Sequence, residues 1–229
     1  MQLPLAIEFP DTACFDSFIA GPNALLVELL HKSARAEGEQ QLYIWSEAGL
    51  GKTHLLQATC RAATAYQHSS CYLPMTELLA QPPGVLEGLA SLHLLALDQL
   101  HLLVGREDWE LALFNLINQC RDSGTRLIMA ANANLSDLSW QLADLASRLA
   151  WGPVFQIRSL DDADKISVLK GRAQRRGIEL ADDVANYLLQ RFPRDLPYLC
   201  EQLDTLDRAA LAAQRRLTIP FIKQVLIGS

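Results

Sequence analysis

The spacing of hydrophobic and polar positions changes along this chain and divides it into three parts. Short, nearly continuous apolar runs alternate with longer amphipathic segments up to about residue 158, and only helical patterns follow. Residues 1–12 hold two prolines and show no clear period. We therefore expect an extended N-terminal arm over residues 1–12, an α/β domain over residues 13–158 and a small all-helical domain over residues 159–229.

Five apolar runs have the length and composition of buried parallel strands, and helical patterns separate them. This order is typical of a parallel sheet that is covered by helices on both faces. The expected strands cover residues 42–45, 71–73, 92–97, 127–131 and 154–157. The expected helices of the same domain cover residues 23–35, 55–66 and 109–120. Three or four helices should follow in the last domain, with breaks at Gly177, residues 193–197 and residues 218–220.

Composition narrows the class of protein. The chain has 229 residues, half of them hydrophobic, and a formal net charge of −6, which is the wrong sign for a protein that coats nucleic acid by itself. No apolar run reaches the roughly 20 residues of a membrane span, and the N-terminus does not resemble a signal peptide, so we expect a cytoplasmic protein. The five cysteines show no metal-ligand spacing, which favours reduced thiols.

A glycine-rich segment between an expected strand and an expected helix is the strongest chemical signal. Residues 46–53 match the end of the P-loop pattern, although Ser46 replaces its first glycine. Glycines let backbone N–H groups approach phosphate oxygens, the following helix adds its positive N-terminal end, and lysine supplies a full charge. We expect nucleotide contacts from Ser46, Gly49, Leu50, Gly51, Lys52, Thr53 and His54.

Polar residues end two of the other apolar runs. Asp98 should hold Mg²⁺ through water, together with the Thr53 hydroxyl. Gln99 stands where nucleoside triphosphatases commonly place a carboxylate, and because an amide cannot act as a base we expect little or no intrinsic hydrolysis. Asn132 is either a further polar contact to the nucleotide or a turn asparagine, with Asn134 as the alternative contact.

Several segments together resemble the bacterial replication initiator DnaA and its AAA+ relatives. They are residues 15–18 (Phe-Asp-Ser-Phe), 21–23 (Gly-Pro-Asn), 49–56 (Gly-Leu-Gly-Lys-Thr-His-Leu-Leu), 147–152 (Ser-Arg-Leu-Ala-Trp-Gly) and 193–196 (Pro-Arg-Asp-Leu). The resemblance covers nearly the whole chain in the right order. It implies an AAA+ module, with a five-stranded parallel P-loop sheet flanked by helices and a helical lid.

The resemblance also assigns roles to single residues. Arg148 would be an arginine finger that acts in trans on a partner's nucleotide, and Arg194 would reach this chain's own nucleotide from the lid. Phe18, Ile19 and Pro22 would lie on the adenine side. The alternatives are a surface arginine near a helix end for Arg148, an arginine paired with a nearby acid for Arg194, and ordinary core packing for the other three residues.

The N-terminus resembles a second known motif. Gln2, Leu3, Leu5 and Ile7 are arranged as in the short peptides with which bacterial replication proteins dock on the sliding clamp. An extended terminus can insert its apolar side chains into a groove while the glutamine forms hydrogen bonds at the rim. An N-terminal strand or a hydrophobic staple would give a similar pattern.

This combination resembles the DnaA-related regulators that lack the initiator's basic DNA-reading domain. The resemblance implies an ADP-bound protein, or one that holds another nucleoside phosphate with or without Mg²⁺, which acts with the DNA-loaded sliding clamp to stimulate hydrolysis of DnaA-bound ATP and to prevent re-initiation. The expected partners are DnaA and the sliding clamp of DNA polymerase III, with DNA met only through the clamp and no membrane. A homodimer or a higher oligomer is left open.

Three other functions remain as alternatives. A DnaA-like or helicase-loader-like ATPase would use its own hydrolysis, which Gln99 disfavours. A DNA-binding initiator is disfavoured by the acidic charge balance. A small-molecule kinase would need a lid over its acceptor substrate, for which the sequence shows no signal.

Overall fold

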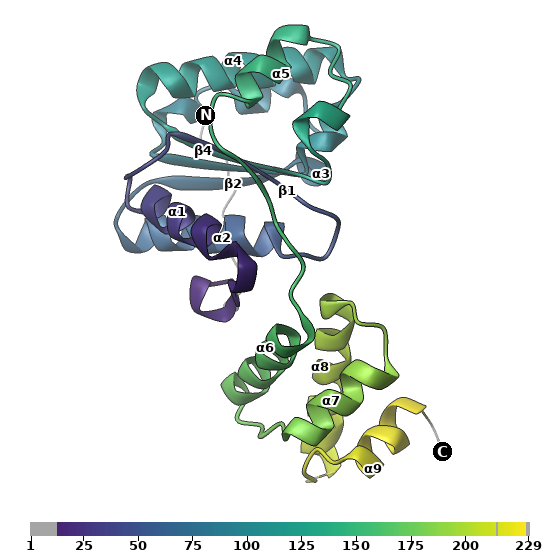
Figure 1. Ribbon diagram of the computed structural model, residues 1–229. Coiled ribbons are helices and arrows are strands. Elements are labelled where there is room, and N and C mark those ends of the chain that lie inside the picture. Colours follow the sequence, from purple (N-terminus) through teal and green to yellow (C-terminus); the bar gives the residue numbers. More distant parts are fainter. Residues whose placement is uncertain (1–12, 214, 228–229) are drawn as a thin grey trace. The chain divides into compact units, whose positions relative to one another are not determined.

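The chain forms two compact units, residues 1–158 and residues 159–229. The structure is a computed structural model and describes residues 13–213 and 215–227 (Figure 1). The expected N-terminal arm over residues 1–12, including the clamp-like peptide, lies outside the described residues.

The first unit is built on a five-stranded parallel sheet. Its strands are β1 (Gln41–Trp45), β2 (Ser70–Pro74), β3 (Leu94–Asp98), β4 (Arg126–Ala131) and β5 (Val154–Gln156). They lie in the order β2-β3-β4-β1-β5, and every neighbouring pair is parallel. The fold class that the sequence predicts is therefore confirmed, and each expected strand is present with ends shifted by two residues or fewer.

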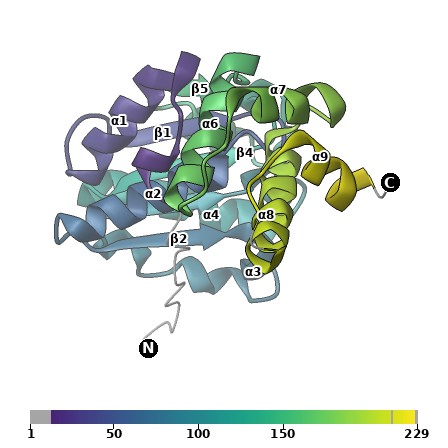
Figure 2. The same ribbon diagram turned by 90° about the horizontal axis from the view of Figure 1, so that it is seen from below.

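Helices cover both faces of this sheet. They are α1 (Ala24–Ala34), α2 (Lys52–Ala65), α3 (Met75–Leu78), α4 (Glu107–Ser123) and α5 (Ala143–Leu149), with short 3-10 turns between them that include η1 (Phe15–Ser17), η2 (Gly21–Asn23) and η5 (Leu100–Leu103). Figures 1 and 2 show α1 and α2 on one side of the strands, and Figure 1 shows α4 and α5 on the other side. The hydrophobic pattern did not predict α5, because seven residues are too few to show a helical period.

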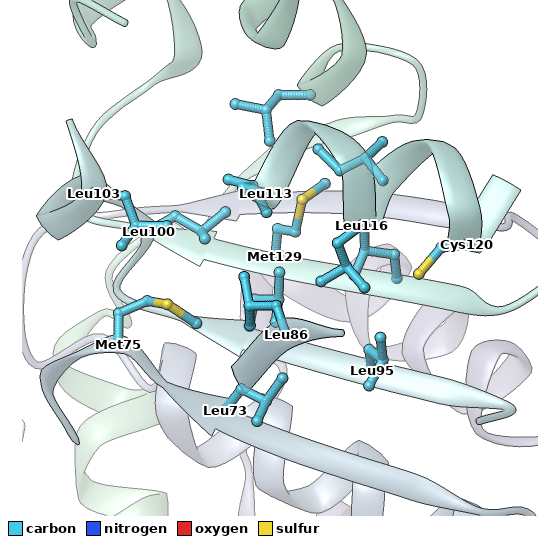
Figure 3. Close-up of a cluster of buried hydrophobic side chains, with 14 of the residues drawn as sticks. Leu73, Met75, Leu86, Leu95, Leu100, Leu103, Leu113, Leu116, Cys120 and Met129 are labelled. Atoms are coloured by element: carbon cyan, nitrogen blue, oxygen red, sulfur yellow. The ribbon is translucent and has the colours of Figure 1, made fainter. Parts of the chain in front are cut away.

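The two faces of the sheet form two separate apolar layers. Successive side chains of a strand point to opposite faces, so Ile44 of β1 packs with the α1 and α2 side, while Met129 of β4 packs with Leu113 of α4 (Figure 3). The same alternation decides toward which face of the sheet the side chain of Asp98, at the end of β3, points. Its side chain lies on the α2 face together with Ala96, two residues earlier.

The second unit is entirely helical among its described residues. It consists of α6 (Asp162–Arg175), α7 (Asp182–Arg191), α8 (Leu196–Ala213) and α9 (Ile219–Ile222), followed by the π-helical turn η7 (Lys223–Ile227). A separate apolar core holds these helices together. The expected break over residues 193–197 is shorter than predicted, because α8 begins at Leu196 and includes Pro197 in its first turn, where a proline N–H would have no helical acceptor.

Candidate functional site

Strand order brings the expected phosphate-binding residues to one edge of the sheet. In a parallel sheet all carboxyl ends lie on the same edge, which is where ligands of α/β proteins bind. β4 lies between β1 and β3. The loop after β1, Asp98 at the end of β3 and Asn132 after β4 are therefore neighbours at this edge.

The glycine-rich loop has the backbone that a phosphate cradle requires. Gly49 and Gly51 adopt φ values of 82° and 92°, in the left-handed region that favours glycine. α2 begins directly afterwards at Lys52 without a side-chain cap, so the first N–H groups of the helix have no partner from a capping side chain. Gly51 also lies against Phe18, since a Cβ atom at this position would come within 2.8 Å of the Phe18 ring.

Lys52 folds back over the entrance of the loop. Its Nζ atom donates to the Ser46 carbonyl oxygen at 2.7 Å, to the Ser46 hydroxyl at 3.0 Å and to the Glu47 carbonyl oxygen at 2.7 Å. Burial lowers the pKa of Lys52, and the charge of Asp98 opposes this effect. Ser46, the departure from the P-loop pattern, is buried and supplies two of the three acceptors. A phosphate could replace these neutral acceptors with anionic oxygens, to which the Lys52 ammonium forms stronger hydrogen bonds.

Asp98 has one oxygen occupied by hydrogen bonds and one without a partner. Its Oδ2 atom accepts from the Thr53 hydroxyl at 2.6 Å and from the Tyr72 hydroxyl at 2.8 Å. Its Oδ1 atom is buried and has no hydrogen-bond partner among the described residues. A buried carboxylate oxygen beside a threonine hydroxyl is the type of oxygen donor that Mg²⁺ takes, so these residues fit the expected metal.

Tyr72 belongs to this site, although the sequence did not single it out. Burial, and the neighbouring Asp98, raise the pKa of the Tyr72 hydroxyl, which stays a donor to the carboxylate. The sequence gives only an indirect indication that Tyr72 lies near Asp98. Tyr72 pairs with Ala96 in the sheet, and Ala96 shares its face with Asp98, but this can be seen only when β2 is known to lie beside β3.

Gln99 adopts a backbone conformation that is rare for a residue with a side chain. Its φ is 62°, and its buried Oε1 atom has no partner among the described residues. Such strain costs on the order of 1–3 kcal/mol and is found mostly at functional sites.

Asn132, after β4, lies beside His101. The backbone N–H of Asn132 donates to His101 Nδ1 at 3.3 Å, and the Asn132 side chain is exposed at the edge of the sheet. Burial, and then the charge of Lys52, lower the pKa of His101, a residue near the loop that the sequence did not indicate.

Residues 13–23 pack against the start of α2. His54 Nε2 lies 2.9 Å from the Cys14 carbonyl oxygen and 3.1 Å from the Ser17 hydroxyl. The rings of His54 and Phe18 are 5.9 Å apart. The remaining expected contacts in this part are Leu50 and Ile19, which are partly buried, and Pro22, which is exposed in η2. Phe18 is thus placed beside the phosphate loop, while the adenine contacts of all these residues remain predictions.

Asn23, also from this segment, holds the end of the first unit. Its buried amide donates to the Arg158 carbonyl oxygen at 3.0 Å and accepts from the Arg158 N–H at 2.8 Å. Arg158 is the last residue before the helical unit. The amide therefore fixes the backbone at the point from which the lid departs.

Arg148 lies at the opposite edge of the sheet. Gln41, the first residue of β1, donates through its side chain to the carbonyl oxygens of Arg148 at 2.8 Å and of Leu149 at 3.0 Å. A five-residue strand spans about 13 Å, and the P-loop begins only after the other end of β1. The structure therefore does not bring Arg148 together with the other expected site residues of the first unit.

Arg194 lies in the second unit, just before α8. Its Nη1 atom contacts the Asp162 carboxylate at 3.1 Å, and both side chains are more than half exposed. A single exposed ion pair of this kind contributes little to stability and leaves the guanidinium able to change partners. Its contact with a nucleotide remains a prediction.

Comparisons with known proteins agree with this geometry. The model of the family described as the Hda lid domain matches residues 162–226, and that of the bacterial DnaA ATPase domain matches residues 10–80. An uncharacterised protein of Haemophilus influenzae is 42% identical over 226 residues, which are 98% of each chain.

No helix among the described residues is long and apolar enough to cross a membrane.

Solved structures share the fold at low sequence identity. Domain III of DnaA from Thermotoga maritima superposes with a TM-score of 0.82 at 20% identity, over 95% of this chain and 97% of that one. AMPPCP-bound DnaA from Aquifex aeolicus superposes with a TM-score of 0.72 at 23% identity, over 85% of this chain and 65% of that chain. The Holliday junction branch migration motor RuvB of T. maritima superposes with a TM-score of 0.73 at 18% identity, over 94% of this chain and 71% of that chain.

The sheet order, the P-loop and the helical unit define an AAA+ module with a lid. The chain is an Hda-like, DnaA-related AAA+ protein. The resemblance read from the sequence is confirmed, and the chain is a DnaA-related replication regulator.

Proposed function

We propose that this chain holds a nucleotide of its own and, with the DNA-loaded sliding clamp, stimulates hydrolysis of the ATP bound to DnaA, which prevents re-initiation. The observation that carries the proposal is the position of Arg148 at the edge of the sheet opposite the P-loop. The whole length of β1 therefore separates Arg148 from this chain's own phosphate loop. Arg148 can act only on a nucleotide that another molecule presents.

The chain's own site is suited to a nucleoside diphosphate such as ADP. The backbone amides around Gly49 and Gly51 and the charge of Lys52 would hold the phosphates. Thr53 and Asp98 would hold Mg²⁺, which screens phosphate charge when it is bound. A DnaA structure of the same fold contains AMPPCP, which supports a nucleotide as the class of ligand.

The identity of Gln99 supports a nucleotide that stays bound to this chain without being hydrolysed. The residue after the metal-binding aspartate is an amide, and an amide cannot take a proton from an attacking water. A ligand that binds only the folded state stabilises it, so the nucleotide would act as a structural component. This feature weighs against the alternative of a loader-like ATPase that uses its own ATP.

The contribution of this chain to the trans step would be a positioned positive charge. Water attacks the γ-phosphorus of the partner's ATP and ADP leaves, while Arg148 neutralises the charge on the transferred phosphoryl group. In other nucleotide switches such an arginine raises the rate by about a thousandfold or more. The N-terminal peptide with Gln2, Leu3, Leu5 and Ile7 would hold the chain on the clamp.

A reconstituted assay of ATP hydrolysis on DnaA, with and without DNA-loaded clamp, tests this function. Arg148→Ala should abolish the stimulation while clamp binding and nucleotide affinity stay unchanged. Arg175→Ala, an exposed arginine on α6 with no ion pair among the described residues, is the matched control and should stimulate normally. Full stimulation by Arg148→Ala would refute the proposal.

A second variant tests the clamp separately. Deletion of residues 2–7 should abolish binding to the clamp and clamp-dependent stimulation while nucleotide affinity stays unchanged. Unchanged clamp binding would show that another part of the chain makes this contact.

A further inference from the structure

α5, the helix that carries Arg148, is held at both ends by side chains from other elements. Before its first turn, the buried Glu110 of α4 accepts from the Leu142 N–H at 2.8 Å. At its last turn, Gln41 of β1 donates to the two carbonyl oxygens described above. A helix of only seven residues is marginal by itself, so these contacts fix the backbone from which the Arg148 side chain extends.

The segment after α5 is also fixed. The Trp151 N–H donates to the Arg148 carbonyl oxygen at 3.2 Å. A Cβ atom at Gly152 would overlap the backbone carbonyl oxygen of Gln41, so the chain passes β1 at a distance that only glycine allows. The backbone position of Trp151 is therefore set by β1 and by α5.

The Trp151 ring lies beside the Arg148 guanidinium. Arg148 Cζ is 4.1 Å from the centroid of the Trp151 ring and 5.5 Å from that of Phe114. Its Nε atom is buried, and no hydrogen-bond partner is found for it among the described residues. Attraction between the cation and the ring faces thus replaces hydrogen bonds in holding the side chain.

Trp151 does not have the surroundings of an ordinary core residue. It is half-buried and lines a cavity of about 180 Å³ near the amino end of β1. A second guanidinium, that of Arg121, lies 3.9 Å from its ring. Neither arginine has an acidic partner within ion-pair distance among the described residues. Glu39 lines the same cavity but makes no ion pair with either arginine, so both guanidinium groups remain able to contact an anionic group brought by another molecule.

We propose that Trp151 is a positioning residue that holds the Arg148 guanidinium in the orientation in which it meets the partner's phosphate. The inference rests on the trans role proposed for Arg148 above. A long side chain on a rigid backbone still has several rotamers, and stacking on a fixed indole ring selects one before the partner arrives. A misplacement of about 1 Å can cost a hundredfold in rate.

Two substitutions at Trp151 separate positioning from packing. Trp151→Leu keeps apolar bulk but removes the π face, and Trp151→Phe keeps a π face of smaller size. Each is titrated against DnaA–ATP with loaded clamp, and the maximal stimulation is measured separately from the half-saturating concentration. The leucine variant should lose about tenfold or more of the maximal stimulation at an unchanged half-saturating concentration, while the phenylalanine variant should stay within about threefold of the parent.

The double variant Trp151→Leu/Arg148→Ala tests whether the effect passes through the arginine. It should match Arg148→Ala alone, because a positioning residue has no effect without the group that it positions. Parental maximal stimulation by the leucine variant, equal loss in both Trp151 variants, or a rise of the half-saturating concentration alone would overturn the inference. Full stimulation by Arg148→Ala would instead overturn the proposed function itself.

Arg148→Lys keeps the test decisive if Trp151→Leu does not fold. Lysine retains the charge but lacks the planar group that stacks on an indole ring. The lysine variant should lose about tenfold or more of the maximal stimulation, and full activity would show that orientation by the ring is unnecessary.

Discussion

The buried carboxylate of Glu110 should be a large single contributor to the stability of the first unit. Its Oε1 atom accepts from the Gly105 N–H at 2.9 Å and its Oε2 atom accepts from the Leu142 N–H at 2.8 Å. The side chain is fully buried in α4. It therefore joins the segment that follows η5 to the segment that leads into α5. Glu110→Gln has the same shape but only one acceptor oxygen, so one backbone N–H must lose its partner.

The magnitude follows from these two contacts. A hydrogen bond to a charged acceptor contributes about 1.5–3 kcal/mol, and the second bond is weakened because its acceptor becomes neutral. We therefore expect a loss of about 3 kcal/mol in the free energy of unfolding. For a domain of 150–250 residues this corresponds to a decrease of about 6–12 °C in the unfolding midpoint.

Thermal and urea unfolding of the parent and the variant at pH 7 measure this loss. Glu107→Gln, which removes an exposed carboxylate in the first turn of the same helix, is the control and should stay within about 0.5 kcal/mol of the parent. Only the unfolding transition of the first unit should move, because both donors to the Glu110 carboxylate, the Gly105 and Leu142 N–H groups, belong to that unit. An unfolding free energy equal to that of the parent would refute the reasoning.

Three further predictions concern the site and pH. Gly51→Ala should lower nucleotide affinity at least about tenfold by calorimetry, because it combines a φ of 92° with a collision with Phe18, whereas Gly124→Ala, with φ 80° and open space around it, should bind normally. Gln99→Glu should raise intrinsic ATP hydrolysis by about tenfold or more in a phosphate-release assay, and an unchanged rate would show that a missing base is not what limits turnover. Burial raises the pKa of Cys120 from 9.0 to about 12. The unfolded thiol therefore ionises first, and stability is lost by about 1.4 kcal/mol per pH unit as pH rises above 9. Urea midpoints between pH 8 and pH 10.5 should fall less steeply for Cys120→Ala, and parallel curves would contradict this.

Local pattern was sufficient for much of the fold and for the phosphate loop. Strands and helices follow from periods of two and 3.6 residues, which neighbouring positions alone display. The phosphate loop is a contiguous segment, so its glycines and Lys52 could be recognised together. The short α5 was missed because its side chains are too few to show a period, although the resemblance had already indicated Arg148 within it.

The contacts missed by sequence reasoning join residues that are distant along the chain. Tyr72 reaches Asp98 only because β2 lies beside β3. Asn23 bonds to a backbone 135 residues away. His101 is close enough to feel the charge of Lys52 because the strands that precede these two residues, β3 and β1, lie on either side of β4. The local sequence pattern does not reveal any of these pairs, because each residue, taken alone, is also compatible with an ordinary structural role.

The sequence by itself determined the elements, the phosphate loop and the type of residue at each strand end, because these depend on backbone preference and side-chain periodicity over a few neighbouring positions. Only the tertiary structure decided which strand ends meet, and therefore that Thr53, Tyr72 and Asp98 share one edge while Arg148 lies at the other. Strand order depends on the packing of whole layers of apolar side chains, a property of the complete chain that no short segment contains.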